Sequence, residues 1–280
     1  MPYLSLTTWS LHRNLGPLRW TRWDAQNQCH IIEEQEQPET ITLLELPKAL
    51  ADKGFRSLEV CHFHFPSTEH DYLSRLKQSF QDAGMTFYTL LVDYGDISSN
   101  DSVRRNADLQ FIKSWIDIAA QAGAERVRVV AGESSPNDQE ALERSAAALQ
   151  ELSHYAKQKG VRVVTENFLA LSSTPENCLY LLRESQEQIG LTADFGNFKQ
   201  PGKYEALAAV LPYAESVHAK AAHNEEGEID AEEFRNCLDL AAQAGYEGPL
   251  TLVYDGPGDL WEGIQRTREV VEPYVTILTK

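Results

Sequence analysis

The feature that most constrains the fold is a regular alternation of short apolar runs with longer amphipathic segments. We predict strands at residues 3–11, 57–65, 85–92, 125–131, 161–167, 189–197, 216–221 and 250–254. The clearest of the intervening helices spans 101–122, where Leu109, Ile112, Ile116 and Ala119 recur at helical spacing before Gly123. Eight strand and helix pairs without a change in composition favour one closed barrel over a doubly wound sheet with a second domain.

The length of the chain agrees with such a barrel. A (β/α)8 barrel needs about 250 residues, and 280 residues leave room for one insertion. We therefore predict an α/β fold, a single (β/α)8 TIM barrel over residues 1–280 with an insertion after the first strand at 13–40. That polar stretch is too long for an ordinary βα loop. It is either a hairpin that covers the mouth as a lid or a plain surface loop, and its Trp20 and Trp23 either stack on a sugar ring or anchor the loop.

Charge and hydropathy exclude several classes of partner. The net charge is -17, with 42 acidic against 25 basic residues, whereas nucleic-acid binding depends on clustered lysine and arginine. No basic membrane-surface segment, signal peptide or run of eighteen apolar residues is present. We expect a cytoplasmic protein that binds neither nucleic acid nor membrane. A homo-oligomer stays open.

Sequence motifs narrow the chemistry further. The four cysteines have no CxxC spacing, so we expect reduced thiols. The chain contains no GxSxG, GxxxxGK[ST] or HExxH motif and no GxGxxG that opens a helix. Nucleotide and hydride chemistry are therefore disfavoured.

Polar side chains end three consecutive predicted strands. Strand alternation places Glu166 last on the inward face of VRVVTEN, Asp194 closes IGLTADFGN, and His218 lies in SVHAKA. In a closed parallel barrel these three side chains converge at the carboxyl-terminal rim. Two carboxylates and an imidazole suit Mn, Mg, Co or Zn. Any one of them alone would be a hydrogen-bonded core residue.

Two further candidates for proton transfer lie near these strand ends. Lys220 shares a face with His218 and either polarises a substrate oxygen, acts as a base, or pairs with Asp194 or Asp255. His62 and His64 share a face of the second predicted strand. We expect one of them, His64 in our assignment, to reach the mouth and the other to be a core histidine.

The predicted substrate-binding residues are Arg128, Asn167, Asn197 and Trp20. Arg128 lies on the fourth predicted strand, where a buried guanidinium would either hold a carboxylate or bind an anionic or hydroxyl-rich substrate. Asn167 and Asn197 follow the acidic residues of strands five and six. The expected ligand is a small carbohydrate.

The strand ends resemble the xylose-isomerase-like TIM barrels, a family of sugar phosphate isomerases and epimerases. The resemblance runs over nearly the whole chain, from SLEVCHFHFP through WIDIAAQAGAERVRVVAGE, TEN, ADFGNF and HAKA to GYEGPLTLVYDG. In the ketose epimerases of this family a divalent metal is held by a Glu on strand five, an Asp on strand six, a His on strand seven and a Glu on strand eight. The resemblance implies the first three roles for Glu166, Asp194 and His218.

The fourth ligand is where this sequence departs from the family. Val253 stands at the position of the strand-eight glutamate. The resemblance implies that this glutamate and the strand-five glutamate are also the two acid/base groups, so a symmetrical mechanism is unavailable here. Asp255, two residues onward, or His64 would then supply the fourth ligand. Asn197 stands where many members have a histidine.

These observations predict a divalent-metal-dependent isomerase or epimerase that acts on a sugar or other polyhydroxylated carbonyl compound through an enediolate. Glu166, Lys220 or His64 would move the proton. One alternative is a lyase that eliminates a β-substituent from a keto-sugar or keto-glycoside, which needs no mirrored pair of carboxylates. The other is a barrel that binds a sugar without catalysis. The acidic charge argues against the endonuclease branch of the family.

Overall fold

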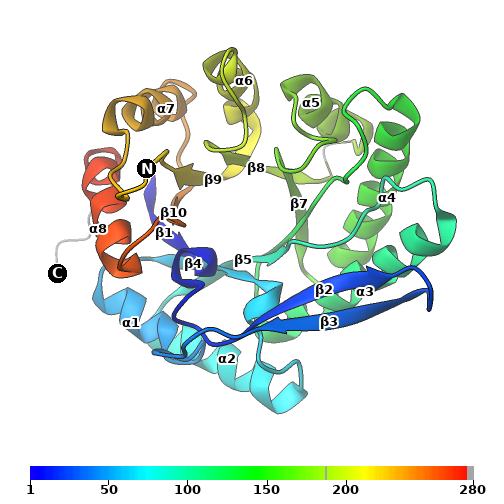
Figure 1. Cartoon of the computed structure of the whole chain (residues 1–280), viewed down its shortest axis with the longest axis horizontal. Coiled ribbons are helices and arrows are strands. Elements are labelled where there is room, and N and C mark those ends of the chain that lie inside the picture. The colour runs from blue at the N-terminus through cyan, green and yellow to red at the C-terminus, as the bar shows by residue number, and fades with distance from the viewer. Residues whose placement is uncertain (187, 276–280) are drawn as a thin grey trace.

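The computed structural model describes residues 1–186 and 188–275 of the chain. At its centre, eight parallel strands of the described residues close into a barrel in the order β1-β10-β9-β8-β7-β6-β5-β4 (Figure 1). These strands are β1 (Tyr3–Thr7), β4 (Ser57–Cys61), β5 (Thr86–Val92), β6 (Arg126–Val129), β7 (Arg162–Glu166), β8 (Gly190–Asp194), β9 (Ala214–Lys220) and β10 (Pro249–Val253). The predicted (β/α)8 barrel is confirmed.

Helices surround the barrel and return the chain from each strand to the next (Figure 1). They are α1 (Leu46–Asp52), α2 (His70–Ala83), α3 (Ser102–Ala122), α4 (Gln139–Gln158), α5 (Pro175–Glu184), α6 (Lys203–Val210), α7 (Ala231–Gln243) and α8 (Leu260–Val271). Capping residues define the ends of several of these helices. The Asp101 carboxylate accepts hydrogen bonds from the first turn of α3, Thr174 caps α5, and Gly123 ends α3 at a positive φ of 81°.

Burial of the strands on both faces accounts for their apolar composition. Leu6, Leu58, Leu90 and Val127 are fully buried in one continuous core cluster that fills the space inside the barrel and between its strands and helices. A smaller cluster of Leu18, Cys61, Phe63 and Leu91, with Trp9 and Trp20 packed against it, lies apart from this core.

The ends of the first two predicted strands differ from the observed ones. The first strand ends at Thr7 and the second at Cys61, and each continues as a 3₁₀ turn, Thr8–Leu11 and His62–His64. The predicted end of the helix after strand five, near Glu187, lies outside the described residues. Apolar alternation alone does not report where a strand leaves the sheet, because a short helical turn can bury the same residue types.

The insertion forms a β-hairpin of β2 (Leu18–Asp24) and β3 (Cys29–Gln35), paired in antiparallel register from Leu18↔Gln35 to Asp24↔Cys29. It extends beyond the barrel across α3 (Figure 1). His30 anchors it there, because its Nε2 lies 2.8 Å from the buried Asp108 carboxylate of α3. Leu18 and Trp20 share the face of β2 that packs on the smaller apolar cluster.

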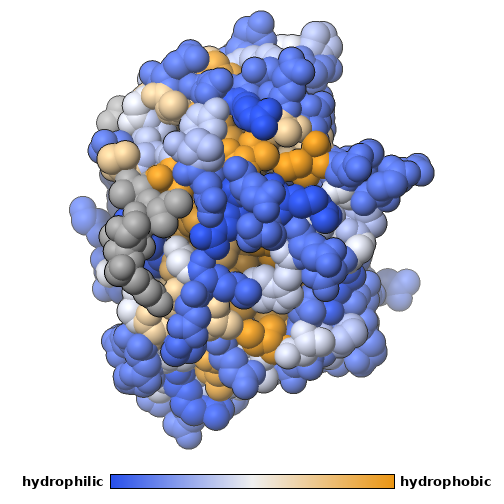
Figure 2. Space-filling view, turned by 90° about the vertical axis from the view of Figure 1, so that its left-hand side faces the viewer, coloured by the Kyte–Doolittle hydropathy of each residue, from blue (hydrophilic) through white to orange (hydrophobic). Residues whose placement is uncertain are grey.

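The molecular surface is largely polar on the side that Figure 2 draws. The apolar patches on this side are small and separated. Among the described helices, none combines the length and the apolar character needed to cross a lipid bilayer. The four cysteines, all within the described residues, are free thiols.

Candidate active site

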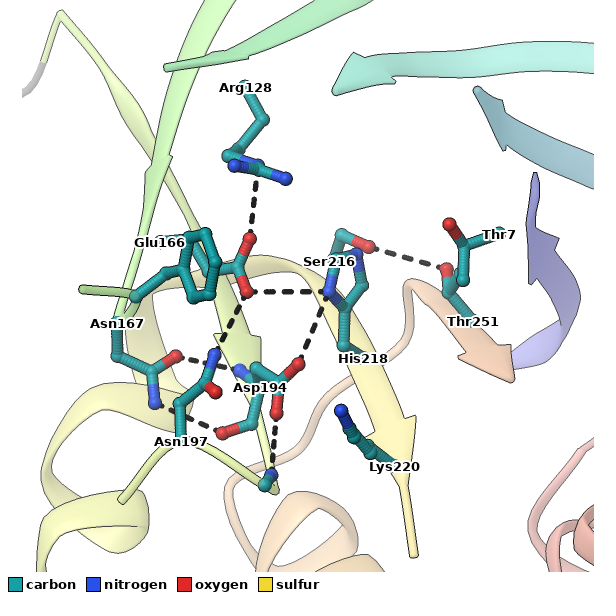
Figure 3. A network of polar contacts seen from close by, with 12 residues as sticks. Thr7, Arg128, Glu166, Asn167, Asp194, Asn197, Ser216, His218, Lys220 and Thr251 are labelled. Carbon is teal, nitrogen blue, oxygen red and sulfur yellow. Dashed lines mark hydrogen bonds and ion pairs between the residues drawn. The ribbon is translucent and has the colours of Figure 1, made fainter. Parts of the chain in front are cut away.

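Three adjacent strands bring Glu166, Asp194 and His218 together at their carboxyl ends. In the parallel ladder Asp194 pairs directly with His218, and Glu166 pairs with Thr192 two residues before Asp194. One ligand atom from each of the three buried side chains lies within 4.8 Å of the others. The Nδ1 atom of His218 is 3.5 Å from a carboxylate oxygen of Glu166 and 3.5 Å from one of Asp194 (Figure 3).

A fully buried carboxylate behind this cluster, Glu59 of β4, was not predicted. It accepts hydrogen bonds from His218 Nε2 at 2.9 Å, Ser216 Oγ at 2.5 Å and Thr251 Oγ1 at 3.0 Å. The first of these places the proton on Nε2 and leaves Nδ1 facing Glu166 and Asp194. A carboxylate behind a ligating histidine is a common way to orient the ring and raise its basicity.

The surroundings of His218 favour positive charge at this point. Burial alone would lower the pKa of His218, but Glu166 and Glu59 on opposite sides of the ring outweigh it and raise the pKa well above its ordinary value. Burial likewise opposes ionisation of Glu59, but the nearby imidazole lowers the pKa of that carboxyl below its ordinary value. A proton or a metal ion at Nδ1 would satisfy the same charge requirement.

Hydrogen bonds hold the two carboxylates of the cluster. Asn197 Nδ2 donates to Glu166 Oε1 at 3.2 Å, and the Gly196 backbone N–H donates to Asp194 Oδ1 at 2.5 Å. Asn167 exchanges hydrogen bonds of 2.7 and 3.0 Å with the backbone of Asp194 and does not line the cavity, so it positions that residue (Figure 3). Of the predicted substrate-binding residues, Asn197 therefore lies in the cavity and Asn167 lies behind it.

Arg128 is buried beside the cluster and holds carboxylates. Its Nε lies 3.0 Å from Glu166 Oε2, and its NH2 forms an ion pair with Asp93. The Nε and Oε2 atoms are not aligned as a hydrogen bond, which leaves this buried carboxylate oxygen without a hydrogen-bond partner. The first of the two roles considered for a buried arginine, holding a carboxylate, is the one observed.

The balance of charged side chains around the cavity indicates whether a cation would fit there. Its lining includes the carboxylates of Asp93, Glu166, Asp194 and Asp255 against the side-chain cations of Arg128 and Lys220. The buried Glu59 adds one more negative charge directly behind His218. With neutral histidine, the site therefore has more negative than positive charge, and a divalent ion would reduce that imbalance. The residues present fit a divalent cation held by Glu166, Asp194 and His218.

Asp255, the predicted fourth ligand, lies outside the group of three. Its carboxylate instead binds Lys220 Nζ at 2.6 Å, accepts from Trp9 Nε1 at 3.4 Å and lies 3.3 Å from His223 Nε2. Burial alone would lower the pKa of Lys220, but Asp255 and Asp194 outweigh it and raise the pKa above its ordinary value. Lys220 therefore enters the cavity as an ammonium ion paired with Asp255, one of the pairings that the sequence left open.

His64 does not reach the cavity, and neither does His62. Both lie in the 3₁₀ turn after β4, where His64 Nδ1 is 2.8 Å from Thr8 Oγ1. Burial lowers the pKa of His62 to about 4 and that of His64 to about 3. The sequence prediction therefore assigned the wrong face of this segment to the barrel interior. Glu59, Cys61 and Phe63 point into the barrel and its mouth. A glutamate within an otherwise apolar strand was the sequence signal for this face.

The cavity at the mouth measures about 350 Å³. Its lining combines the polar cluster with the apolar side chains of Trp9, Trp20, Phe63, Leu91, Phe168 and Val253. Trp20 lines the cavity, whereas Trp23 lies on the other face of β2 and packs against His30. Trp9 was missed because the first strand was expected to continue through it. Val253 contributes an apolar surface at the position where the resemblance to the family implies a fourth metal ligand.

A closed (β/α)8 barrel with a polar cluster at the carboxyl ends of three adjacent strands defines a TIM-barrel protein with a candidate metal centre. The family model described as "Xylose isomerase-like TIM barrel" matches residues 47–272. The chain belongs to this family. No curated protein sequence is significantly similar to it.

Solved structures share the fold at low sequence identity. A D-tagatose 3-epimerase-like protein is 17% identical with a TM-score of 0.69, over 97% of this chain and 96% of that one. A xylose isomerase-like TIM barrel protein from Mycobacterium smegmatis, in complex with magnesium, is 15% identical with a TM-score of 0.67 over 100% and 98%. The 3-keto-D-glucoside 4-epimerase from E. coli is 16% identical with a TM-score of 0.63 over 82% and 94%.

Proposed function

We propose that this protein is a divalent-metal-dependent sugar isomerase or epimerase whose active site is the cavity at the mouth of the barrel. The observation that carries the proposal is the convergence of Glu166, Asp194 and His218 within 4.8 Å, with the far nitrogen of His218 held by Glu59. The family match and the epimerases among the similar folds support the same class of reaction.

Glu166, Asp194 and His218 would hold the ion. A bound divalent cation would polarise neighbouring carbonyl and hydroxyl oxygens of a sugar and stabilise the negative charge that develops when the C–H bond between them is broken. Glu166 is the base that removes this proton, since it is a carboxylate in the lining of the cavity. Arg128 and Asn197 hold its carboxylate in position.

Lys220 supplies the second proton-transfer group. It lines the same cavity, and its raised pKa keeps it protonated at neutral pH. It is suited to donate a proton or a hydrogen bond to the enediolate. The pairing of one carboxylate with one ammonium replaces the symmetrical pair of glutamates, because Val253 offers no acid or base.

The same asymmetry favours a second candidate function. Elimination needs one base and one acid that protonates the leaving group, and Glu166 and Lys220 satisfy this requirement without a carboxylate at position 253. The specific observation in its favour is the apolar Val253 side chain in the cavity lining.

Metal analysis and deuterium exchange test the proposal. Protein purified without added metal should contain about one equivalent of Mn, Mg, Co or Zn, and Glu166→Gln or Asp194→Asn should lose it. In D2O, NMR should detect exchange at the carbon next to the carbonyl of a ketose or 3-keto-glucoside. Exchange with a rearranged or epimeric sugar supports isomerisation, and exchange with loss of water or an alcohol supports elimination. Absence of both metal and exchange in folded protein would leave a sugar-binding barrel.

A further inference from the structure

The cavity has an apolar wall that the proposed proton transfer does not use. We define the apolar wall as Trp9, Trp20, Phe63, Leu91 and Val253, which line the same cavity as the polar cluster. The rings of Trp20 and Phe63 have centroids 4.5 Å apart, and Trp9 lies 6.2 Å from Trp20 and 5.9 Å from Phe63. These distances are those of packed aromatic pairs, so the three rings form one continuous surface.

The inserted hairpin completes this wall. Leu18 and Trp20 of β2 pack on Cys61, Phe63 and Leu91 in an apolar cluster separate from the main core. His30 on β3 anchors the hairpin to Asp108 of α3. The hairpin is thus held so that one tryptophan faces the cavity, while Trp23 on the opposite face packs against His30.

The polar atoms of the wall are already paired. Trp9 Nε1 donates to Asp255 at 3.4 Å, and Trp20 Nε1 donates to Gln35 Oε1 at 2.9 Å. Thr7 Oγ1, beside the wall, accepts from the Trp9 backbone N–H and contacts Cys61 Sγ. A sugar hydroxyl placed against the three rings would find no hydrogen-bond partner on them, and such unpaired burial is costly. An apolar, flat group would lose nothing.

We infer that the apolar wall is a binding subsite for an aromatic aglycone, so that the substrate is an aryl glycoside or aryl keto-glycoside rather than a free monosaccharide. This inference rests on the proposed function for the place of the sugar, which lies against the polar cluster. The aryl group packs against the surface that Trp20, Trp9 and Phe63 present to the cavity. Trp20 is a specificity-determining residue.

Calorimetric titration with unreactive glycosides tests the inference. Phenyl β-D-glucopyranoside should bind about tenfold more tightly than methyl β-D-glucopyranoside, which corresponds to about 1.4 kcal/mol. Trp20→Ala should reduce this ratio to about one without weakening the methyl glycoside, and Trp20→Phe should retain most of it. Trp23→Ala is the matched control: it removes the same ring from the same strand on the other face and should leave the ratio unchanged. Far-UV circular dichroism of each variant reports folding.

Several results would overturn the inference. They are no measurable binding of the phenyl glycoside, equal affinities in the wild-type protein, a ratio that survives Trp20→Ala, an equal loss in Trp23→Ala, or tighter binding of methyl β-cellobioside, which would mean a second sugar ring occupies the wall. Asp194→Asn separates the two proposals, because it should abolish exchange yet keep the phenyl-to-methyl ratio. If the wild-type protein keeps the phenyl-to-methyl affinity ratio but shows no deuterium exchange, the proposed function alone is refuted. If it shows exchange but binds both glycosides equally, this inference alone is refuted.

Discussion

Replacement of Glu59 by Gln should weaken metal binding by roughly 10- to 100-fold, about 1.4 to 2.7 kcal/mol. The side chains have the same shape, and the Gln oxygen can still accept the Nε2 proton of His218 while its NH2 group donates to Ser216 and Thr251. The change therefore removes charge and keeps geometry. Because Glu59 is fully buried and its contact with His218 is 2.9 Å, little solvent screens the lost charge, and we expect the upper part of this range.

Calorimetric titration of metal-free protein with Mn²⁺ measures this effect, and the visible spectrum of the Co²⁺ form reports the coordination. Ser216→Ala is the control, since it removes one hydrogen bond to Glu59 and leaves its charge. It should cost about 1 kcal/mol in stability and weaken metal binding less than Glu59→Gln does. A Glu59→Gln protein with native circular dichroism and a Mn²⁺ affinity within twofold of wild type would refute the role given to Glu59.

Three further predictions concern stability and the missing ligand. The pKa of His62 falls from 6.5 to about 4 on folding, so unfolded protein binds more protons and stability falls as the pH drops from 6.5 to 4. In the His62→Asn protein, the free energy of unfolding should fall by roughly 3 kcal/mol less over this pH range than in the wild type. Urea denaturation at several pH values measures this, and equal slopes of unfolding free energy against pH in the two proteins would contradict it. Val253→Glu should bind Mn²⁺ about tenfold more tightly by adding a carboxylate, and calorimetry showing weaker binding would oppose this. Phe195→Ala, which empties a fully buried site against Phe234, should cost about 3 to 5 kcal/mol in chemical denaturation.

The sequence predicted the group of Glu166, Asp194 and His218 but not the residues around it, and the arrangement of the site explains why. Glu166, Asp194 and His218 end adjacent strands of one parallel barrel, and strand parity with the barrel closure is enough to bring such residues to one rim. Glu59, Trp9 and the hairpin residues reach the same rim from elements far apart in sequence. Their positions depend on which face of β4 enters the barrel, on where β1 turns into a 3₁₀ helix and on how the hairpin packs against the barrel. Local apolar patterning does not encode these features.

The sequence by itself determined the barrel, the inserted segment and the group of two carboxylates and one imidazole, because alternation and strand order are local properties of the chain. Only the tertiary structure decided which face of β4 enters the barrel, and so put Glu59 behind His218 and left His64 outside. It also decided that Asp255 pairs with Lys220 and that Trp20 meets Phe63. Those contacts depend on packing between distant segments, where burial and charge balance select one partner among several that the sequence allows.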